Sequence, residues 1–170
     1  MEKEVHEFEP VYDENSKVLI LGSFPSVLSR KNEFYYGNPR NRFWKVLAAL
    51  TNEEEPETVP EKKEFLLRNG IAVYDAAESC KIEGSSDSSM KDIEPSSLSP
   101  IFEKADIKKV FANGRKAYDI IVKYHVGEGK DMGTEMELEL LPSTSPANAQ
   151  YSLERLIECW QPVSEALNIK

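Results

Sequence analysis

The chain of 170 residues contains little cysteine and little histidine, with two residues of each. Cys80 and Cys159 do not form a Cys-x-x-Cys pair, and two thiols cannot supply the four ligands of an iron–sulfur cluster. A structural zinc site would need both histidines as well, and His6 and His125 lie far apart in the sequence. We therefore expect no metal centre and no cofactor, and we expect both cysteines to be small apolar core residues.

Long hydrophobic runs are also absent. No apolar segment approaches the roughly 20 residues that a membrane-spanning helix requires. The first ten residues are acidic and lack the basic-then-apolar pattern of a signal peptide. The hydrophobic fraction of 40% permits a core, and 170 residues suit one domain. We therefore expect a single domain over residues 1–170 in a soluble, cytoplasmic protein without a membrane partner, associated with the nucleoid if the source is prokaryotic.

Three common functional motifs do not occur. The chain has no Gly-x-Gly-x-x-Gly for a dinucleotide, no Gly-x-x-x-x-Gly-Lys-Ser/Thr for a triphosphate, and no Gly-x-Ser-x-Gly of α/β hydrolases. Neither histidine falls in a predicted strand-end loop with a candidate serine, which disfavours a Ser-His-Asp triad.

Short apolar runs alternate with helix-like segments along the chain. Buried strands are predicted at four places: 17–22, 71–75, 109–112 and 137–142. Helices are predicted from Asn38-Pro39 onward, over 61–68, over 115–124, and from Ser152 onward with an interruption at Pro162. Residues 81–100, with seven serines between Ser85 and Ser99, are predicted to be mostly loop. The alternation predicts an α/β fold, a three-layer sandwich with a central four-stranded, mostly parallel sheet flanked by helices.

In open α/β sheets, ligands bind beyond the carboxyl ends of the strands. Four predicted loops lie there: 23–38, 75–96, 113–115 and 143–151. Gly22-Ser-Phe-Pro-Ser26 follows the first strand, where glycine permits a tight turn and the next amides could line an anion or a carbonyl. Leu141-Pro-Ser-Thr-Ser-Pro-Ala-Asn148 follows the last strand, and its hydroxyl groups could bind phosphate or a base edge. Taken alone, each segment is equally typical of an ordinary connection.

The net charge of −9 argues at face value against a nucleic-acid partner. The charge is unevenly distributed, however. Residues 1–15 and 51–61 each carry five more acidic than basic residues, whereas residues 16–50 carry six basic residues and one acidic residue. The basic stretch could contact phosphate or could simply be solvated surface, and charge alone does not decide between the two.

Three blocks in the observed order resemble the uracil-DNA glycosylase superfamily. They are Gly22-Ser-Phe-Pro, Phe34-Tyr-Tyr-Gly-Asn-Pro-Arg-Asn-Arg-Phe-Trp-Lys45 and Leu141-Pro-Ser-Thr-Ser-Pro-Ala-Asn-Ala149. The second block is similar to the mismatch-specific uracil/thymine branch, and the third is similar to the hypoxanthine-DNA glycosylases. Phe24 stands where the first motif often has Asp or Asn, and Leu141 stands where the last motif often has His. The hypoxanthine branch also lacks both of these catalytic side chains.

The resemblance implies a monofunctional DNA glycosylase that hydrolyses the N-glycosidic bond of deaminated bases, hypoxanthine first and uracil second, in base excision repair. The implied partner is damaged DNA, double- or single-stranded, and we expect a monomer. Two alternatives remain open. One is a uracil- or xanthine-preferring glycosylase on the same fold. The other is a catalytically silent nucleic-acid-binding module, because Phe24 and Leu141 replace the usual catalytic groups. No lysine occupies a recognisable position for a Schiff base, so lyase activity is not expected.

The resemblance also assigns candidate site residues. The catalytic asparagine of the hypoxanthine branch matches Asn41, which could hold a water in the first turn of a helix or merely cap that helix. The candidate base-binding residues are Gly22, Ser23, Phe24, Tyr36, Asp75 and Asn113. The candidate DNA-binding residues are Arg30, Lys31, Arg40, Arg42, Ser143, Thr144, Ser145, Pro146, Ala147 and Asn148.

Several candidates have a second interpretation. Tyr36 matches the stacking aromatic of the mismatch-specific branch, whereas its neighbours Phe34 and Tyr35 could fill the core. The Asp75 carboxylate would accept the N1–H of hypoxanthine, or it could be a solvated strand end or a helix cap. Arg42 could bind phosphate or pair with the acidic residues 51–61.

Overall fold

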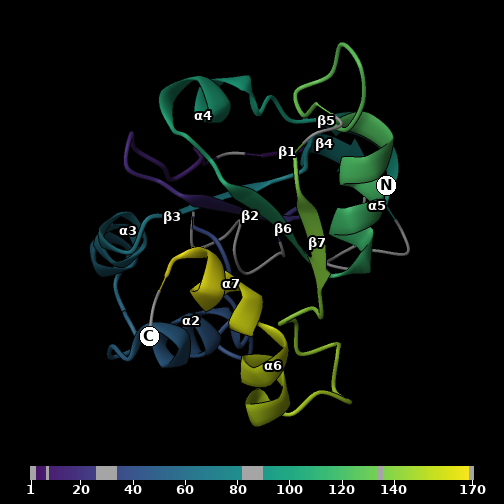
Figure 1. The fold of residues 1–170 in the computed structure, drawn as a ribbon. Helices are drawn as coiled ribbons and strands as arrows, with labels where there is room; N and C mark the ends of the chain where they lie inside the picture. The colour runs from purple at the N-terminus through teal and green to yellow at the C-terminus, as the bar shows by residue number, and fades with distance from the viewer. Residues whose placement is uncertain (1–2, 7, 26–33, 82–89, 134–135, 169–170) are drawn as a thin grey trace.

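Figure 1 shows the ribbon of the computed structural model, which describes residues 3–6, 8–25, 34–81, 90–133 and 136–168. The central sheet contains β2 (Val18–Gly22), β3 (Ile71–Asp75), β6 (Lys109–Asn113) and β7 (Leu138–Leu141). Its strand order is β3-β2-β6-β7, and every neighbouring pair is parallel. The four strands predicted from the sequence are confirmed, and their carboxyl ends all lie at one edge of the sheet.

Helices cover both faces of this sheet. They are α2 (Phe43–Thr51), α3 (Val59–Arg68), α4 (Ser99–Lys104), α5 (Arg115–Tyr124), α6 (Leu153–Cys159) and α7 (Gln161–Ala166). In Figure 1, α2, α3, α6 and α7 lie on one side of the sheet, and α4 and α5 lie on the other. The predicted three-layer α/β sandwich is confirmed, as is the predicted interruption at Pro162, which lies in the first turn of α7.

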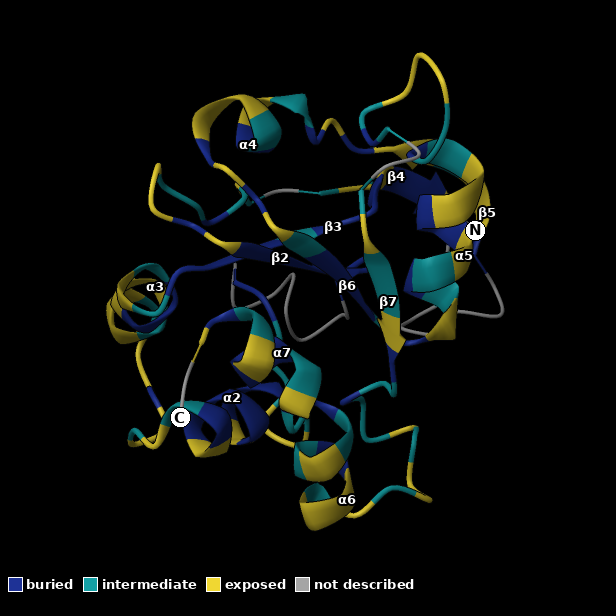
Figure 2. Ribbon diagram, viewed as in Figure 1, coloured by how far each residue is buried: buried dark blue, intermediate teal, exposed yellow. Residues whose placement is uncertain are grey.

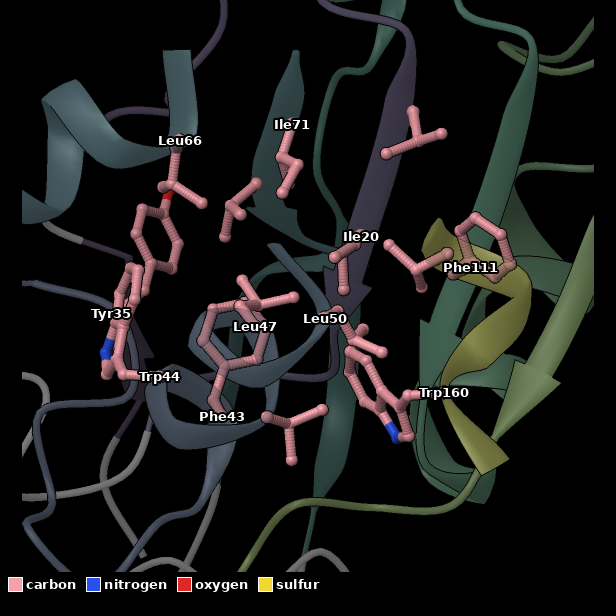
Figure 3. Packing of buried hydrophobic residues seen from close by; sticks show 14 of the residues in the cluster. Ile20, Tyr35, Phe43, Trp44, Leu47, Leu50, Leu66, Ile71, Phe111 and Trp160 are labelled. Carbon is pink, nitrogen blue, oxygen red and sulfur yellow. The ribbon is translucent and has the colours of Figure 1, made fainter. Parts of the chain in front are cut away.

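The sheet separates two hydrophobic cores because successive side chains of a strand point to opposite faces. Val18 and Ile20 of β2 belong to the first core, and Leu19 and Leu21 belong to the second. Figure 3 shows the first core, in which Phe43 and Leu47 of α2 and Trp160 pack near Ile20. Figure 2 shows the result: the central strands are buried, and the helices expose only their outer faces. Phe34 and Tyr35, whose core-filling interpretation was one alternative, are both buried in the first core.

A second, smaller sheet was not predicted. It is antiparallel, with the order β1-β4-β5, and contains Lys3–Val5, Ala77–Lys81 and Lys91–Pro95. The prediction of a loop over residues 81–100 is therefore wrong for β5 and for the start of α4, while residues 82–89 lie outside the described residues. Four of the five residues of β5 are exposed, so its sequence shows no apolar alternation. Pairing with β4 rather than local propensity makes it a strand.

Helix α2 begins at Phe43, later than the predicted start at Asn38-Pro39. The Asn38 side-chain oxygen accepts a hydrogen bond from the Arg40 amide at 2.9 Å, and the Asn41 oxygen accepts one from the Phe43 amide at 2.9 Å. Asparagine side chains that bond to the backbone two residues onward compete with helix formation. Asn41 therefore lies just before the helix rather than in its first turn, which corrects the prediction.

The remaining predicted features need only small adjustments. Helix α3 begins two residues before the predicted start, with Thr58 accepting a hydrogen bond from the Glu61 amide at 3.2 Å. Cys80 is buried in the second core, as predicted, whereas Cys159 is only partly buried against the first. Within the described part of the chain, no helix has the length and apolar character needed to cross a membrane.

Candidate active site at the carboxyl edge of the sheet

A pocket of about 260 Å³ lies at the carboxyl ends of the parallel strands. Its lining comes from the ends of β2, β3, β6 and β7 and from the turns before α2. The lining residues are Gly22, Ser23, Phe24, Pro25, Tyr35, Tyr36, Asn38, Asn41, Asp75, Asn113, Ser143, Thr144, Ser145, Pro146 and Ala147. The candidate catalytic residue, all six candidate base-binding residues and five of the candidate DNA-binding residues thus meet in one place.

Other candidates lie elsewhere. Arg40 is exposed and outside the pocket lining. Asn148 lines the neighbouring groove instead, and its side-chain amide donates to the Ser143 carbonyl at 3.0 Å. Arg30 and Lys31 lie outside the described residues.

Asp75 ends β3 and is buried at the pocket wall. Its Oδ2 lies 2.8 Å from His6 Nε2, and the side chains of Asp75 and His6 are only 5% and 1% exposed. Neither alternative interpretation of Asp75, a solvated strand end or a helix cap, is correct. His6 was not predicted to lie in the site, because 69 residues separate the two partners and no local motif surrounds His6.

Gly22 allows Asp75 and Tyr36 to approach the end of β2. A Cβ atom at position 22 would lie 2.5 Å from Asp75 Oδ1 and 3.0 Å from the Tyr36 hydroxyl oxygen. The first distance is shorter than any real Cβ contact, and the obstructing carboxylate is itself held by His6. Glycine at this position is therefore required by packing, and not by a positive φ.

Tyr36 lies with its ring stacked on Phe43, with the ring centroids 3.8 Å apart and an angle of 22° between the planes. Phe43 covers one face of the Tyr36 ring, and Tyr36 also lines the pocket. The hydroxyl is buried and has no hydrogen-bond partner among the described residues, although the Asn113 side chain lies beside it. Burial, and then the charge of Asp75, raise the pKa of Tyr36, so its hydroxyl stays protonated and can donate.

Asn41 is half-buried and lines the same pocket. Its side-chain oxygen accepts the hydrogen bond from the Phe43 amide, which fixes the orientation of the side chain. An amide oxygen has two lone pairs, so the second can bind a water molecule. The N-cap of α2 is Arg42, so Asn41 does not cap the helix, and its bond to the Phe43 amide is compatible with the water-holding interpretation.

The segment 143–147 forms one wall of the pocket and is tied to β6. The Asn113 amide nitrogen donates to Thr144 Oγ1 at 3.1 Å, and the Thr144 backbone amide donates to Asn113 Oδ1 at 3.1 Å. The Ser145 amide donates to Ser143 Oγ at 3.1 Å. The Asn113 side chain therefore holds this segment in place and keeps one donor hydrogen and one lone pair for other partners.

Arg42 binds the same segment from the opposite side. Its guanidinium donates to the backbone carbonyls of Ser145 at 2.8 Å, Asn148 at 3.1 Å, Thr144 at 3.4 Å and also Tyr151. A planar group with five N–H donors can serve several carbonyls at once, as no other side chain can. Among the described residues Arg42 makes these carbonyl contacts and no ion pair with the acidic residues 51–61, so that interpretation is wrong, whereas its role as a phosphate ligand stays a prediction.

Acidic, histidine and cysteine side chains do not form a metal-binding group of three or more within the described residues. The site is instead built from amides, hydroxyls, one carboxylate and aromatic rings. A parallel α/β sheet covered on both faces, with such a pocket at the carboxyl ends of its strands, defines an α/β enzyme of the open-sheet class.

The family model of the uracil DNA glycosylase superfamily matches residues 9–164, and the chain belongs to this superfamily. A protein of Methanosarcina acetivorans named hypoxanthine DNA glycosylase is 36% identical over 160 residues, which cover 92% of this chain and 95% of that protein. A second protein named hypoxanthine DNA glycosylase, from Methanosarcina barkeri, is 36% identical over 145 residues, which cover 83% of this chain and 86% of that protein. A solution NMR structure from M. acetivorans, described as a candidate uracil DNA glycosylase, superposes with a TM-score of 0.76 at 32% identity over 95% of this chain and 96% of that one.

Proposed function

We propose that this chain is a monofunctional DNA glycosylase that hydrolyses the N-glycosidic bond of deaminated bases, with hypoxanthine as the preferred base. The observation that carries the proposal is the meeting of Asn41, Tyr36 and Asp75 in one pocket of a superfamily member. Relatives named hypoxanthine DNA glycosylase support the choice of base. A base inside an intact duplex cannot reach the groups that line a pocket, so the target base must leave the stack to enter it.

The pocket can supply each part of the reaction. Bond cleavage generates an oxocarbenium-like sugar, so a water molecule is a sufficient nucleophile when Asn41 holds it in place. Negative charge develops on the departing base and is stabilised by amides near Ser23 and Phe24 or by the hydroxyls of Ser143 and Ser145. The Asp75 carboxylate accepts the N1–H of hypoxanthine. Adenine has a lone pair at N1 instead of a hydrogen, and the Asp75 carboxylate would repel that lone pair.

The reaction ends at hydrolysis. None of the described residues that line the pocket is a lysine, so the pocket offers no amine for a Schiff base with the sugar. The chain acts as a monomer on damaged DNA, and the exposed side chain of Arg40 beside the pocket turns is one contact for the phosphate backbone.

A panel of oligonucleotides tests the proposal. Each carries one inosine, uracil, xanthine or ethenoadenine, as a duplex and as a single strand, and the released free base is quantified. Hypoxanthine should be released fastest, uracil more slowly, and ethenoadenine should remain, because it has no N1–H for Asp75. Binding to damaged DNA without release of any base would instead identify a silent binding module.

A further inference from the structure

His6 lies directly after β1 and outside the residues that match the family model, which begin at residue 9. Its backbone amide donates to the Glu78 carbonyl at 2.7 Å, which ties this part of the chain to β4. The imidazole ring is packed among aromatic rings, with centroid distances of 4.6 Å to Phe8, 5.1 Å to Tyr74 and 5.7 Å to Tyr35. The ring is therefore held with one polar atom, Nε2, against Asp75, which lines the pocket.

We propose that His6 is a positioning residue that holds Asp75 as the acceptor for the N–H on the Watson–Crick edge of the extruded base. The proposal rests on the proposed function, and it adds the β1 segment to the specificity machinery of the site. His6 acts through Asp75 and does not itself contact the base.

The backbone of Asp75 is fixed from several directions. Ser96 Oγ donates to the Asp75 carbonyl at 2.7 Å, and the next amide, that of Ala76, donates to the Gly22 carbonyl at 2.8 Å. The remaining freedom is rotation of the carboxylate. His6 engages Oδ2, and this places Oδ1 beside Gly22 at the pocket wall.

The hydrogen-bonding pattern also assigns the proton. His6 Nδ1 is buried and has no partner within the part of the chain that the structure describes, so the ring with its proton on Nε2 leaves no N–H unpaired there. That N–H donates to Oδ2 and stabilises the negative charge of a carboxylate that is largely removed from water. An ionised carboxylate can only accept hydrogen bonds. Asp75 therefore matches the N1–H of hypoxanthine or xanthine and the N3–H of uracil, and opposes the N1 lone pair of adenine.

His125 shows what a purely structural histidine looks like in this chain. It is also buried, but its two nitrogens lie 2.8 Å from the Ala76 carbonyl oxygen and 3.3 Å from Asp131 Oδ2, and it does not line the pocket. His6 differs because the one polar contact of its ring among the described residues is a carboxylate at the pocket wall.

A matched pair of variants tests the role of His6. His6→Leu introduces an apolar side chain of similar size and removes the donor. His6→Gln replaces the ring N–H by a side-chain amide N–H that reaches the position of Nε2. Because hydrogen bonds to charged groups are among the stronger ones, His6→Leu should lower kcat/KM for hypoxanthine roughly 10- to 100-fold, and His6→Gln should restore most of it. Phe8→Leu, which disturbs the packing around the ring, should lower the melting temperature without this loss of excision.

A double-mutant cycle shows whether His6 acts through Asp75. The effect of His6→Leu should largely disappear in the Asp75→Asn background, since the charge to be held is gone. Additive losses, or a His6→Leu variant that matches the wild type, overturn the proposal. If His6→Leu does not fold, the same cycle with His6→Asn, whose shorter amide cannot reach Oδ2, replaces it. Failure of the wild-type chain to release any base would overturn the proposed function, whereas normal wild-type excision with an unaffected His6 variant overturns only the role of His6.

Discussion

Asn41 owes its position to a turn that its own side chain builds. The hydrogen bond from the Phe43 amide orients the side-chain oxygen, and Phe43 in turn is buried in the first core and carries the Tyr36 ring. This rigid support fits the role proposed for Asn41, which is to hold the water molecule that attacks the sugar. The orientation of Asn41 is thus fixed before any substrate binds.

Asn41→Ala should reduce base excision roughly 30- to 1,000-fold, or about 2–4 kcal/mol of barrier, the usual contribution of one placed catalytic group. Loss of the bond to the Phe43 amide should cost only about 1 kcal/mol of folding stability. Single-turnover kinetics on an inosine duplex measure the first effect, and thermal melting measures the second. Binding of the damaged duplex should be largely retained.

Asp13 provides the control for this variant. Its side chain accepts a hydrogen bond from the Asn15 amide at 2.9 Å, the same two-residue spacing as in Asn41, but it lies outside the pocket lining. Asp13→Ala should cause a comparable small loss of stability and no loss of excision. A folded Asn41→Ala variant with near wild-type turnover would move the catalytic role to Asp75 or Ser143.

At the scale of elements, the segment after β7 is held between two anchors. Asn113 binds Thr144 from β6, and Arg42 binds the carbonyls of Ser145 and Asn148 from the turn before α2. The same turn carries Asn41, so the two walls of the pocket are joined by the residue next to the catalytic candidate. A disturbance of either anchor should alter the shape of the pocket.

Arg42→Lys should therefore destabilise the protein by about 1.5–3 kcal/mol, because one ammonium cannot replace the fork of donors. The melting temperature should fall by several degrees, and excision should slow. Arg42→Gln, which also removes the charge, should leave the salt dependence of DNA binding unchanged, since the guanidinium is already used by backbone carbonyls. A shallower salt dependence in Arg42→Gln would show that Arg42 contacts phosphate.

The elements that sequence analysis predicted are those with a local signal. Strands β2, β3 and β6 are continuous apolar runs because both of their faces are covered, and such runs are visible in a single sequence. Strands β1 and β5 are short and largely exposed, so only their partners define them.

The same distinction explains the site. Most pocket-lining residues lie in the three recognised blocks, and Asp75 and Asn113 lie at the ends of predicted strands. The role of Arg42, in contrast, depends on carbonyls more than 100 residues away. The partner of Asp75 is likewise a histidine with no motif around it. Contacts across such distances follow from the tertiary fold and leave no pattern in the nearby sequence.

At the scale of the whole molecule, a chain with a net charge of −9 must bind a polyanion. The basic residues of the segment 16–50 have to offset repulsion from the rest of the surface, so the affinity should be modest and should fall steeply with salt. Arg40→Ala should weaken binding to damaged and undamaged DNA alike and should reduce the slope of log Kobs against log salt by about one. Titration of a fluorescent duplex at several salt concentrations measures the affinity and the slope, with the equally charge-removing Arg42→Gln as the neighbouring control.

The composition of the pocket makes a second prediction for the whole enzyme. Catalysis by a placed water and by hydrogen-bond donors needs no divalent ion, and the described residues offer no ligand group for one. Excision of hypoxanthine should therefore proceed at an unchanged rate after dialysis against EDTA. Loss of activity that a divalent ion restores would contradict the mechanism.

The uniform direction of the central sheet has a practical consequence. Because all four strands run the same way, every group assigned to the reaction lies at one edge, and the opposite edge carries only the starts of the strands. Lys108 stands there, one residue before β6, with its side chain 65% exposed. A fluorophore or a surface linker attached at Lys108 would leave the pocket open, so that single immobilised molecules could be watched while they scan DNA.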